Sequence, residues 1–242
     1  MTQSLNGTVA LITGASGGIG SCIARRLAQE GVNLALMGRD MEKLKKTAAS
    51  LAGCGVQALL LPGDLLDDAY IAQCVSQVTA QFGRLDILVN NAGMALSRPF
   101  EKTTMAEFDR IMALNCRAPY LMCQAALPLL RRSPCGTILN IASVNAHKGY
   151  PLQSAYSASK HALAGFTKSL ASELYRDGMR VHLISPGGVF TDMVRISRPD
   201  LTGEDMILPE DIAEIAAFLL LHRTNAVIDE ICVHRAGKEP FL

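Results

Sequence analysis

The stretch VALITGASGGIG, residues 9–20, decides the fold of this chain. Residues 9–13 form an almost wholly apolar run. Glycines at 14, 18 and 20 follow it in the pattern G-x-x-x-G-x-G, and a helical pattern then begins. Glycine permits a tight turn and lets backbone N–H groups approach a pyrophosphate at the N-terminus of a helix. A glycine cluster alone is often only a loop, but its position between a first strand and a first helix predicts a dinucleotide-binding turn.

Short β-rich runs alternate with helical patterns along the whole chain. The expected strands are 9–13, 33–37, 56–61, 87–90, 136–141, 181–184 and 230–233, and the expected helices are 19–30, 41–52, 68–82, 104–131, 154–176 and 210–221. The strand runs are nearly all apolar instead of alternating, which is typical of parallel strands covered on both faces. We therefore predict an α/β fold, a doubly wound sheet of about seven parallel strands with helices on both faces. Because the composition does not shift and no linker appears, residues 1–242 are predicted to form one domain.

The composition is that of a globular protein, with 49% hydrophobic and 19% charged residues. A net charge of +1 gives no strong field for nucleic acid or an anionic membrane. The longest apolar runs, such as residues 216–221, are far shorter than the roughly 20 residues that span a bilayer. The N-terminal segment also lacks the pattern of a signal peptide. We therefore expect a cytoplasmic protein that binds neither nucleic acid nor membrane.

The cysteines and histidines give no sign of a disulfide framework or a metal centre. The 7 cysteines are scattered without a C-x-x-C pair, and the 5 histidines form no H-x-x-x-H or Cys/His cluster. An odd, scattered set of cysteines is typical of reduced thiols in a cytosolic protein. The sequence predicts no metal site.

The end of the second predicted strand bears on which dinucleotide binds. It reads LMGRD, residues 36–40, with Gly38 at the position where NAD-preferring folds carry an acid for the ribose 2′-hydroxyl. The guanidinium of Arg39 suits a 2′-phosphate. NADP is therefore predicted in preference to NAD, which stays possible. The alternatives are that Arg39 is a surface residue at the start of a helix, or that it pairs with Asp40.

Tyr156 and Lys160 lie four residues apart in SAYSASKHALAGFTK, residues 154–168, a run with helical periodicity. Residues four apart share a helix face, so the phenol and the ammonium can point into one cleft. A phenol has an ordinary pKa of about 10, and a nearby cation lowers that pKa towards the range in which proton transfer is efficient. Taken alone, such a pair is more often a solvated lysine beside a half-buried tyrosine.

Further motifs surround this pair in a fixed order. They are TGASGGIG at 13–20, NNAG at 90–93, Asn115 in a long helical pattern, Ser143, Tyr156-x-x-x-Lys160 and PGGVFT at 186–191. In order and spacing, the chain resembles the short-chain dehydrogenase/reductase family from about Leu5 to Val233. The resemblance implies a single Rossmann-type domain. It also implies an enzyme that interconverts a carbonyl and a secondary alcohol with a nicotinamide cofactor.

The resemblance implies catalytic roles for four residues. Tyr156 would protonate the carbonyl oxygen during reduction and act as the base in reverse, while Lys160 would lower its pKa and bind the nicotinamide ribose. Ser143 would hydrogen-bond the substrate oxygen, and Asn115 would hold a water that links Lys160 to solvent. Two donors aimed at an oxygen that gains negative charge lower the barrier to hydride transfer without a metal. Singly, Asn115 could instead bond a carbonyl one turn back, and Ser143 could cap a turn.

Cofactor contacts are implied in segments that lie far apart in the chain. In similar proteins NNAG borders the adenosine ribose, Asp64 contacts adenine, and residues 186–191 bind the carboxamide and pyrophosphate side. The full expected set is Gly14, Ser16, Gly17, Gly18, Ile19, Gly20, Arg39, Asp64, Leu65, Asn90, Ala92, Gly93, Tyr156, Lys160, Pro186, Gly187, Val189 and Thr191. As alternatives, Asp64 could cap helix 68–82, although Asp67 is better placed, and residues 90–91 could form a plain turn.

Substrate contacts are expected between Ser143 and Tyr156. By resemblance, Asn145 and Gln153 would lie nearest the reacting carbonyl, together with Ser143 and Tyr156. The intervening segment, residues 144–153, offers further pocket candidates, among them His147. Because this pocket has no acidic or basic cluster, a neutral carbonyl is favoured, and ketones, sugars, sterols and acyl thioesters all stay open. With the resemblance, the expected substrate is a carbonyl of ketone or 3-oxoacyl type. The identity of the substrate and the physiological direction stay open.

Two segments depart from the family's pattern. Residues 192–208 are shorter than the helical lid of many relatives and predict a small or mobile lid, with a plain connecting loop as the alternative. The residues available to line a cleft there are Met193, Val194, Ile196, Met206 and Ile207. The tail, residues 234–242, is charged and then apolar, and it would either pack across a subunit boundary or fray.

The predicted helices 104–131 and 154–176 are apolar on more than one face, which indicates burial against a partner, with burial in the core of the monomer as the alternative. In relatives these helices meet their copies across a two-fold axis, so a homodimer or homotetramer is expected. Two readings compete with an NADP-dependent carbonyl reductase. One is an NAD-linked secondary-alcohol dehydrogenase of hydroxysteroid or sugar type. The other is a non-catalytic NADP-binding regulator, which the presence of all four catalytic residues disfavours.

Overall fold

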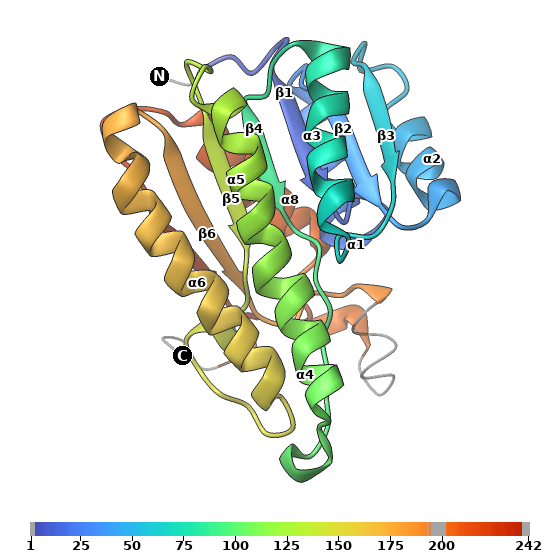
Figure 1. The fold of residues 1–242 in the computed structure, drawn as a ribbon, viewed down its shortest axis with the longest axis vertical. Coiled ribbons are helices and arrows are strands. Elements are labelled where there is room, and N and C mark those ends of the chain that lie inside the picture. The colour runs from blue at the N-terminus through green and yellow to red at the C-terminus, as the bar shows by residue number, and fades with distance from the viewer. Residues whose placement is uncertain (1–2, 193, 195–201, 239–242) are drawn as a thin grey trace.

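One sheet of seven parallel strands forms the centre of the molecule, in the order β3-β2-β1-β4-β5-β6-β7. The computed structural model describes residues 3–192, 194 and 202–238 (Figure 1). The strands are β1 Val9–Thr13, β2 Asn33–Gly38, β3 Ala58–Pro62, β4 Ile87–Asn90, β5 Thr137–Ile141, β6 Arg180–Pro186 and β7 Glu230–Val233. The strand order reverses between β1 and β4, which is where ligands bind in open α/β sheets. The predicted α/β fold is confirmed.

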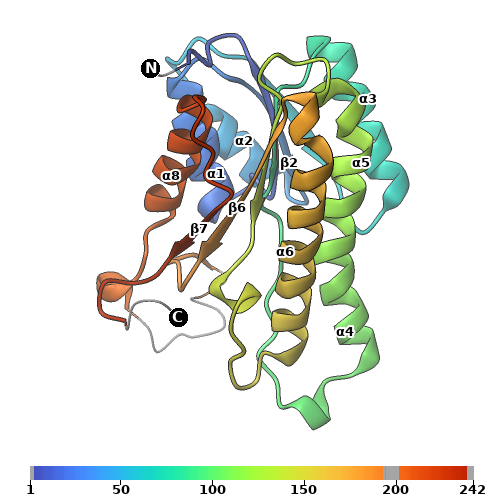
Figure 2. The ribbon, with the colours of Figure 1, turned by 90° about the vertical axis from the view of Figure 1, so that its left-hand side faces the viewer.

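Helices cover both faces of this sheet, as Figure 2 shows. One face carries α1 Gly18–Gln29, α2 Met41–Ala49 and α8 Pro209–Leu221. The other carries α3 Asp68–Phe82, α4 Met105–Met112, α5 Ala118–Leu130 and α6 Ser154–Leu174. Within the layers, α1 contacts α8, α3 contacts α5, and α4 contacts α6.

The apolar strand runs explain why both faces are covered. All five residues of β1 are buried, and successive side chains of a strand point to opposite faces. Ala10 and Ile12 accordingly belong to the core under α1 and α8, while Val9 and Leu11 belong to the core under α3 and α5. Leaving either face in water would expose a full row of aliphatic side chains.

The predicted helix 104–131 is not continuous in the structure. A π turn, Ala113–Arg117, separates α4 from α5, and the N–H of Ala118 bonds the carbonyl of Ala113. Pro119 follows directly, and proline lacks the N–H that would bond the carbonyl four residues earlier, that of Asn115. The wider turn therefore lies where a regular helix would be interrupted in any case.

Helix caps settle one of the alternatives raised by the sequence. Asp67 caps α3, because its carboxylate accepts from the N–H groups of Ala69 and Tyr70. Asp64 instead accepts from the N–H of Leu66 in the turn after β3. Asp64 therefore does not act as the cap of α3.

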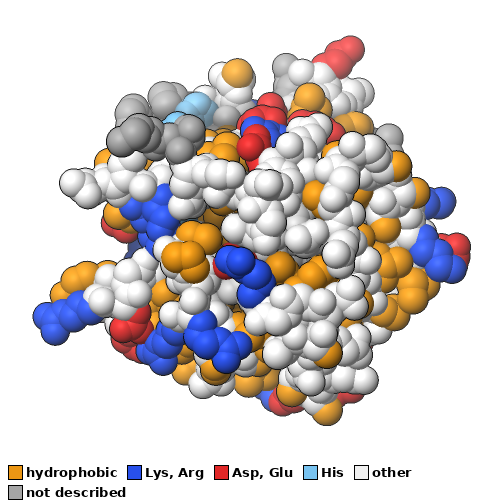
Figure 3. All heavy atoms as spheres, turned by 90° about the horizontal axis from the view of Figure 1, so that it is seen from above, with side chains coloured by type: hydrophobic (Ala, Val, Ile, Leu, Met, Phe, Trp, Pro, Cys, Tyr) orange, Lys and Arg blue, Asp and Glu red, His pale blue; other side chains and the backbone are white. Residues whose placement is uncertain are grey.

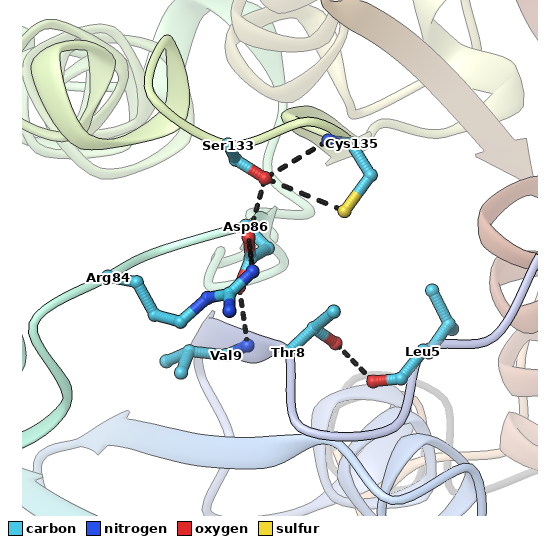
Figure 4. Close-up of polar contacts among 7 residues, drawn as sticks. All are labelled: Leu5, Thr8, Val9, Arg84, Asp86, Ser133 and Cys135. Carbon is cyan, nitrogen blue, oxygen red and sulfur yellow. Dashed lines mark hydrogen bonds and ion pairs between the residues drawn. The ribbon is translucent and has the colours of Figure 1, made fainter.

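A buried carboxylate joins three segments at the start of β4 (Figure 4). Asp86 is fully buried and accepts two bonds from the guanidinium of Arg84, both at 2.8 Å. It also accepts from the N–H of Val9 at 2.9 Å and from the hydroxyl of Ser133 at 2.5 Å. Nearby, the Thr8 hydroxyl donates to the carbonyl of Leu5. These bonds fix the entries of β1 and β4 relative to the end of α5.

Surface charge, free cysteines and helix hydrophobicity by themselves point to no further site in the part of the chain that the structure describes. Figure 3 shows basic, acidic and hydrophobic side chains intermixed on the end of the molecule that is uppermost in Figure 1. All seven cysteines are unpaired. Among the helices of the described residues, none combines the length and apolar character that a bilayer crossing requires.

Candidate active site

The glycine turn lies between β1 and α1, as the sequence predicts. Gly14 has a φ of +67°. A Cβ added at Gly20 would lie 2.3 Å from the carbonyl oxygen of Gly14, so the backbone closes too tightly for any side chain. The N-cap of α1, Gly17, offers no side-chain bond, and its first turn carries no acid. The first N–H groups of α1 are therefore available to an anion.

The NNAG segment after β4 is fastened to this turn by Thr13 and Asn91, neither of which is among the predicted site residues. The hydroxyl of Thr13 accepts from the N–H groups of Asn91 and Ala92, both at 3.0 Å. The Asn91 amide donates to the carbonyls of Thr13 at 3.0 Å and Gly14 at 3.2 Å. Their polar side chains at adjacent strand ends, across the strand-order reversal, are the signal that could have found them.

The side chain of Asn90 points into the interior instead. Asn90 is 2% exposed, and its amide donates to Asn140 at 2.8 Å and to the sulfur of Cys123 at 3.3 Å. The amide of Asn140 in turn donates to Thr167. Any contact of this segment with a ribose must therefore come from its backbone or from Ala92 and Gly93, which are partly exposed.

The end of β2 is followed by an exposed guanidinium, that of Arg39. Arg39 is exposed and forms no ion pair with any residue that the structure describes. Asp40 does not pair with it, because the Asp40 carboxylate caps α2 through the N–H of Lys43. A Cβ at Gly38 would lie 3.0 Å from the hydroxyl of Ser16, so the glycine turn touches the end of β2. Because residue 38 is a glycine, the Ser16 side chain can lie against the end of β2, next to Arg39.

A cavity of about 220 Å³ opens between α1 and α2 beside this point. It is lined by Ser16, Gly17, Ser21, Arg25, Lys43, Lys46, Thr47 and Ser50. Three of these described residues are cations and none is an acid; although Arg25 also pairs with Glu210, Lys43 and Lys46 leave the cavity favourable to an anionic group. Asp64 is exposed and Leu65 partly exposed beyond the neighbouring end of β3.

The segment after β6 returns over the glycine turn. The methyl group of Thr191 would lie 3.2 Å from a Cβ at Gly18, so the two residues are adjacent. Val189 forms a parallel bridge with Ile207, and the N–H of Phe190 bonds the Ile207 carbonyl at 2.8 Å. Of the predicted lid, Ile207 lies in the core, whereas Met193, Ile196 and Pro199 lie outside the described residues.

Lys160 and Tyr156 project from α6 towards the end of β5. Lys160 is 5% exposed, and its ammonium donates to the carbonyl of Ile141 at 3.0 Å. Its Nζ lies 5.9 Å from the centroid of the Tyr156 ring. The predicted pair therefore shares one site, as residues four apart on a helix should.

Asn115 is held from both sides in the π turn. Its carbonyl oxygen accepts from the N–H of Met94, and its amide donates to the Met94 carbonyl, both at 2.8 Å. The amide also donates to Ser159 at 3.0 Å, and the Ser159 hydroxyl donates to the backbone carbonyl of Tyr156 at 2.7 Å. The alternative in which Asn115 bonds one turn back in its own helix does not hold.

Gly93 connects the two halves of the site. A Cβ at Gly93 would lie 3.2 Å from the side-chain oxygen of Asn115 and 3.7 Å from Nζ of Lys160. Since residues 91–92 bond the glycine turn, the turn, NNAG, Asn115 and Lys160 form one contiguous group of residues near the carboxyl ends of the strands.

The residues predicted for substrate form a hydrogen-bonded chain. Ser143 begins the short 3-10 turn Val144–Ala146 (η3), and its oxygen accepts from the N–H of Asn145 at 3.2 Å. The Asn145 amide donates to Gln153 at 2.7 Å and to the hydroxyl of Ser157 at 3.0 Å. Ser143 therefore caps a turn and still lies in the site, so the two readings of this residue are compatible.

Burial is the largest influence on the pKa values of Lys160 and Tyr156. It lowers the pKa of the Lys160 ammonium to about 8. It also raises the pKa of the Tyr156 phenol, and a hydrogen bond with Ser143 acts in the opposite direction. The expected lowering by the lysine is thus not the main influence on Tyr156 in this structure; the hydroxyl of Ser143 is what favours its phenolate.

Strand order, glycine turn and cleft residues together define a Rossmann-type α/β protein. The family model described as short chain dehydrogenase matches residues 8–202. The chain is 34% identical to an uncharacterized oxidoreductase, YxjF, of Bacillus subtilis, over 95% of this chain and 97% of that protein. It is 36% identical to levodione reductase of Leifsonia aquatica, over 84% of this chain and 78% of that protein.

A solved structure agrees with these sequence relatives. It is a metagenomic short-chain oxidoreductase in complex with NADP, with a TM-score of 0.84 and 36% identity, covering 96% of this chain and 99% of that chain. This protein belongs to the short-chain dehydrogenase family of oxidoreductases.

Proposed function

We propose that this chain interconverts a carbonyl of ketone or 3-oxoacyl type and a secondary alcohol, with NADPH as the reductant and Tyr156 as general acid and base. The single observation that carries the proposal is the position of Gly93. It places Lys160 and Asn115 directly beside the segment that is fastened to the glycine turn. The proton donors and the residues that would hold the cofactor therefore lie together near the carboxyl ends of the strands, and hydride transfer with protonation requires them to be close.

The glycine turn fits a dinucleotide on its own geometry. Gly14 and Gly20 leave no room for side chains, and the N-terminus of α1 has no protein cap for its N–H groups. A pyrophosphate suits that position. The residues that would hold the cofactor are those of the turn, the 92–93 backbone, Thr191 and Lys160. When bound, the nicotinamide supplies the hydride that reduces the carbonyl carbon.

Tyr156 and Ser143 then act on the carbonyl oxygen. As negative charge develops there, the Tyr156 hydroxyl transfers its proton to the oxygen, and the Ser143 hydroxyl donates a hydrogen bond to it. In the oxidative direction Tyr156 takes the proton back from the alcohol. Asn145 and Gln153 hold the turn that carries Ser143, so the donor is fixed before substrate arrives.

Lys160 and Asn115 restore the proton that Tyr156 gives up. The lowered pKa of Lys160, about 8, suits exchange near neutral pH. Every polar atom of the Asn115 side chain already has a partner in Met94 or Ser159. A relaying water would therefore bond its backbone carbonyl, which Pro119 leaves without the usual donor.

NADP is preferred over NAD on charge grounds. Arg39 is unpaired among the described residues, Gly38 replaces an acid, and three cations line the adjoining cavity. A 2′-phosphate would gain charge-assisted hydrogen bonds there, whereas a bare 2′-hydroxyl would gain little. The NADP-bound relative supports this preference. An NAD-linked dehydrogenase is the alternative.

As part of the same proposal, the chain forms a homodimer or homotetramer through α5 and α6. Tyr120 on α5 is 49% exposed and meets Phe166 of α6 edge to face, with ring centroids 5.6 Å apart. An exposed aromatic on α5 that packs on a half-buried aromatic of α6 suits an isologous contact through these two helices. Sedimentation at micromolar concentration should give a dimer or tetramer, and a monomer mass would remove this part of the proposal.

The test of the catalytic proposal is Tyr156→Phe. We expect oxidation of NADPH with a panel of ketones to fall by about 10²-fold or more, because the proton donor is lost. NADPH binding, followed by fluorescence, should persist. Tyr175→Phe is the matched control, since Tyr175 is 62% exposed on the surface turn after α6. Full activity in Tyr156→Phe would reject the mechanism.

A further inference from the structure

Three side chains with metal-binding atoms meet at the edge strand β7, beside the segment 144–153 that is expected to line the substrate pocket. His147 follows η3, while Glu230 and Cys232 lie on β7. Their ligand atoms all lie within 4.8 Å of one another. Glu230 and Cys232 are two residues apart on a strand and so share a face. His147 is 83 residues from Glu230 in sequence, which is why residue spacing did not predict the group.

Polar atoms converge on one oxygen of Glu230. Its Oε1 lies 2.5 Å from Nε2 of His147, 2.9 Å from the hydroxyl of Ser185 and 3.9 Å from the sulfur of Cys232. Ser185 on β6 stands opposite Cys232 in the strand register, and its oxygen is 3.4 Å from Nε2 of His147. The other carboxylate oxygen is 4.0 Å from the ammonium of Lys168. The side chains of His147, Ser185 and Cys232 thus all point towards the carboxylate of Glu230.

We propose that His147, Glu230 and Cys232 bind a divalent transition-metal ion of the Zn²⁺ class. Imidazole nitrogen, carboxylate oxygen and thiolate sulfur are the ligands that zinc takes in proteins, and Ser185 or water completes four positions. A thiolate and a carboxylate balance the two positive charges. The thiolate and the imidazole also select against Mg²⁺ and Ca²⁺, which take oxygen ligands.

Binding the ion exchanges hydrogen bonds for metal bonds. Cys232 loses its thiol proton to solvent, and His147 ligates through the lone pair of Nε2 while its proton stays on Nδ1. Metal bonds of about 2.0–2.3 Å place tetrahedral ligands roughly 3.3–3.8 Å apart. His147 must therefore draw back slightly from Glu230, and the Cys232 sulfur must move slightly inward, both within side-chain rotation.

The site is open to an ion from solvent. The side chains of His147 and Glu230 are 26% and 22% exposed, and Cys232 is exposed on the edge strand. A bound ion would join β7 to the turn that starts at Ser143. The segment that carries a catalytic hydroxyl would then be fastened to the sheet edge, which should stabilise the fold without supplying a reacting group.

Cobalt is the probe for this site, because a Co²⁺–thiolate bond gives a near-ultraviolet charge-transfer band. The full chain, with thiols kept reduced by a phosphine, should bind one Co²⁺ and develop this band, and Zn²⁺ should remove it by competition. Cys232→Ser should abolish the band. Cys54→Ser is the matched control, since Cys54 is a partly buried free thiol elsewhere, and it should keep the band.

Zn²⁺ affinity and thermal stability provide a second measurement. Glu230→Gln should weaken Zn²⁺ binding at least about tenfold, and Zn²⁺ should raise the melting temperature of the wild type but not of Cys232→Ser. The proposal is overturned if the wild type gives no charge-transfer band, or if the band survives in Cys232→Ser. Zn²⁺ binding that is equal in the wild type and Glu230→Gln would overturn it as well.

Discussion

Lys160 donates from its ammonium to the carbonyl oxygen of Ile141, which ends β5, at 3.0 Å. This bond ties the middle of the sheet to α6 and holds the lysine at 5% exposure beside Tyr156. Burial of that kind disfavours the charged form and lowers the pKa of the lysine to about 8. The buried position that makes Lys160 suitable for proton exchange is thus one in which its positive charge destabilises the folded chain.

Stability should depend on pH through Lys160. The folded chain releases this proton near pH 8, whereas the unfolded chain keeps it up to the ordinary value of 10.5. Unfolding between these values takes up a proton, so stability rises with pH there. Relative to Lys160→Met, the wild type without cofactor should gain on the order of 3 kcal/mol across this window. Urea unfolding below pH 8 and near 10 measures it, and a pH-independent difference between the two proteins would contradict it.

Cofactor choice should change with Arg39→Glu. The new carboxylate would repel a 2′-phosphate, so KM for NADPH should rise at least about tenfold while KM for NADH changes little. Initial rates with both cofactors measure this. Arg132→Glu, an exposed arginine beyond α5, is the charge-matched control and should leave both constants unchanged. Equal losses with NADPH and NADH would remove the argument for NADP.

Removing the carboxylate of Asp86 should destabilise the fold strongly. Asp86→Ala leaves the N–H of Val9 and the hydroxyl of Ser133 without their acceptor, at a site with no exposure, and should cost about 3–5 kcal/mol. Arg84→Met leaves the buried Asp86 carboxylate without its cation, but the N–H of Val9 and the hydroxyl of Ser133 still bond it, so this change should cost less, about 2 kcal/mol. Urea denaturation compares them; similar losses would show that the ion pair, not the buried acceptor, matters.

Asn115→Ala should affect both stability and rate. It leaves the N–H and the carbonyl of Met94 unpaired, which should cost about 2–4 kcal/mol, and it frees Ser159 from its partner. We also expect kcat to fall while KM for NADPH changes less, because the cofactor cradle is intact. Asn225→Ala, in an exposed loop, is the control for the amide change. A variant as stable and active as the control would refute the role of Asn115.

Local signals predicted most of the fold, because each strand carries its own apolar run. β1 and β7 have the predicted ends, and the glycine turn follows β1 as expected. The π turn at Ala113–Arg117 was missed because the apolar pattern continues through it, although Pro119 was a visible cue. Sequence patterns identify a helix well and its local winding poorly.

In the candidate site, side-chain direction was the part that sequence could not supply. The NNAG motif drew attention to Asn90, yet Asn91 makes the bonds to the glycine turn and Asn90 points inward. Likewise, the neighbouring lysine suggested a lowered pKa for Tyr156, whereas burial raises it. Depth below the surface depends on tertiary packing, which motif spacing does not encode.

The π turn contains one residue more than a regular helix needs at that point. Deleting a single residue there would let α4 and α5 merge into one regular helix without turning either half, because the wider turn is what accommodates the extra residue. Such a shortened protein would keep its helical content and lose the alignment of Asn115 with Met94. A one-codon deletion could therefore silence the enzyme while leaving it folded.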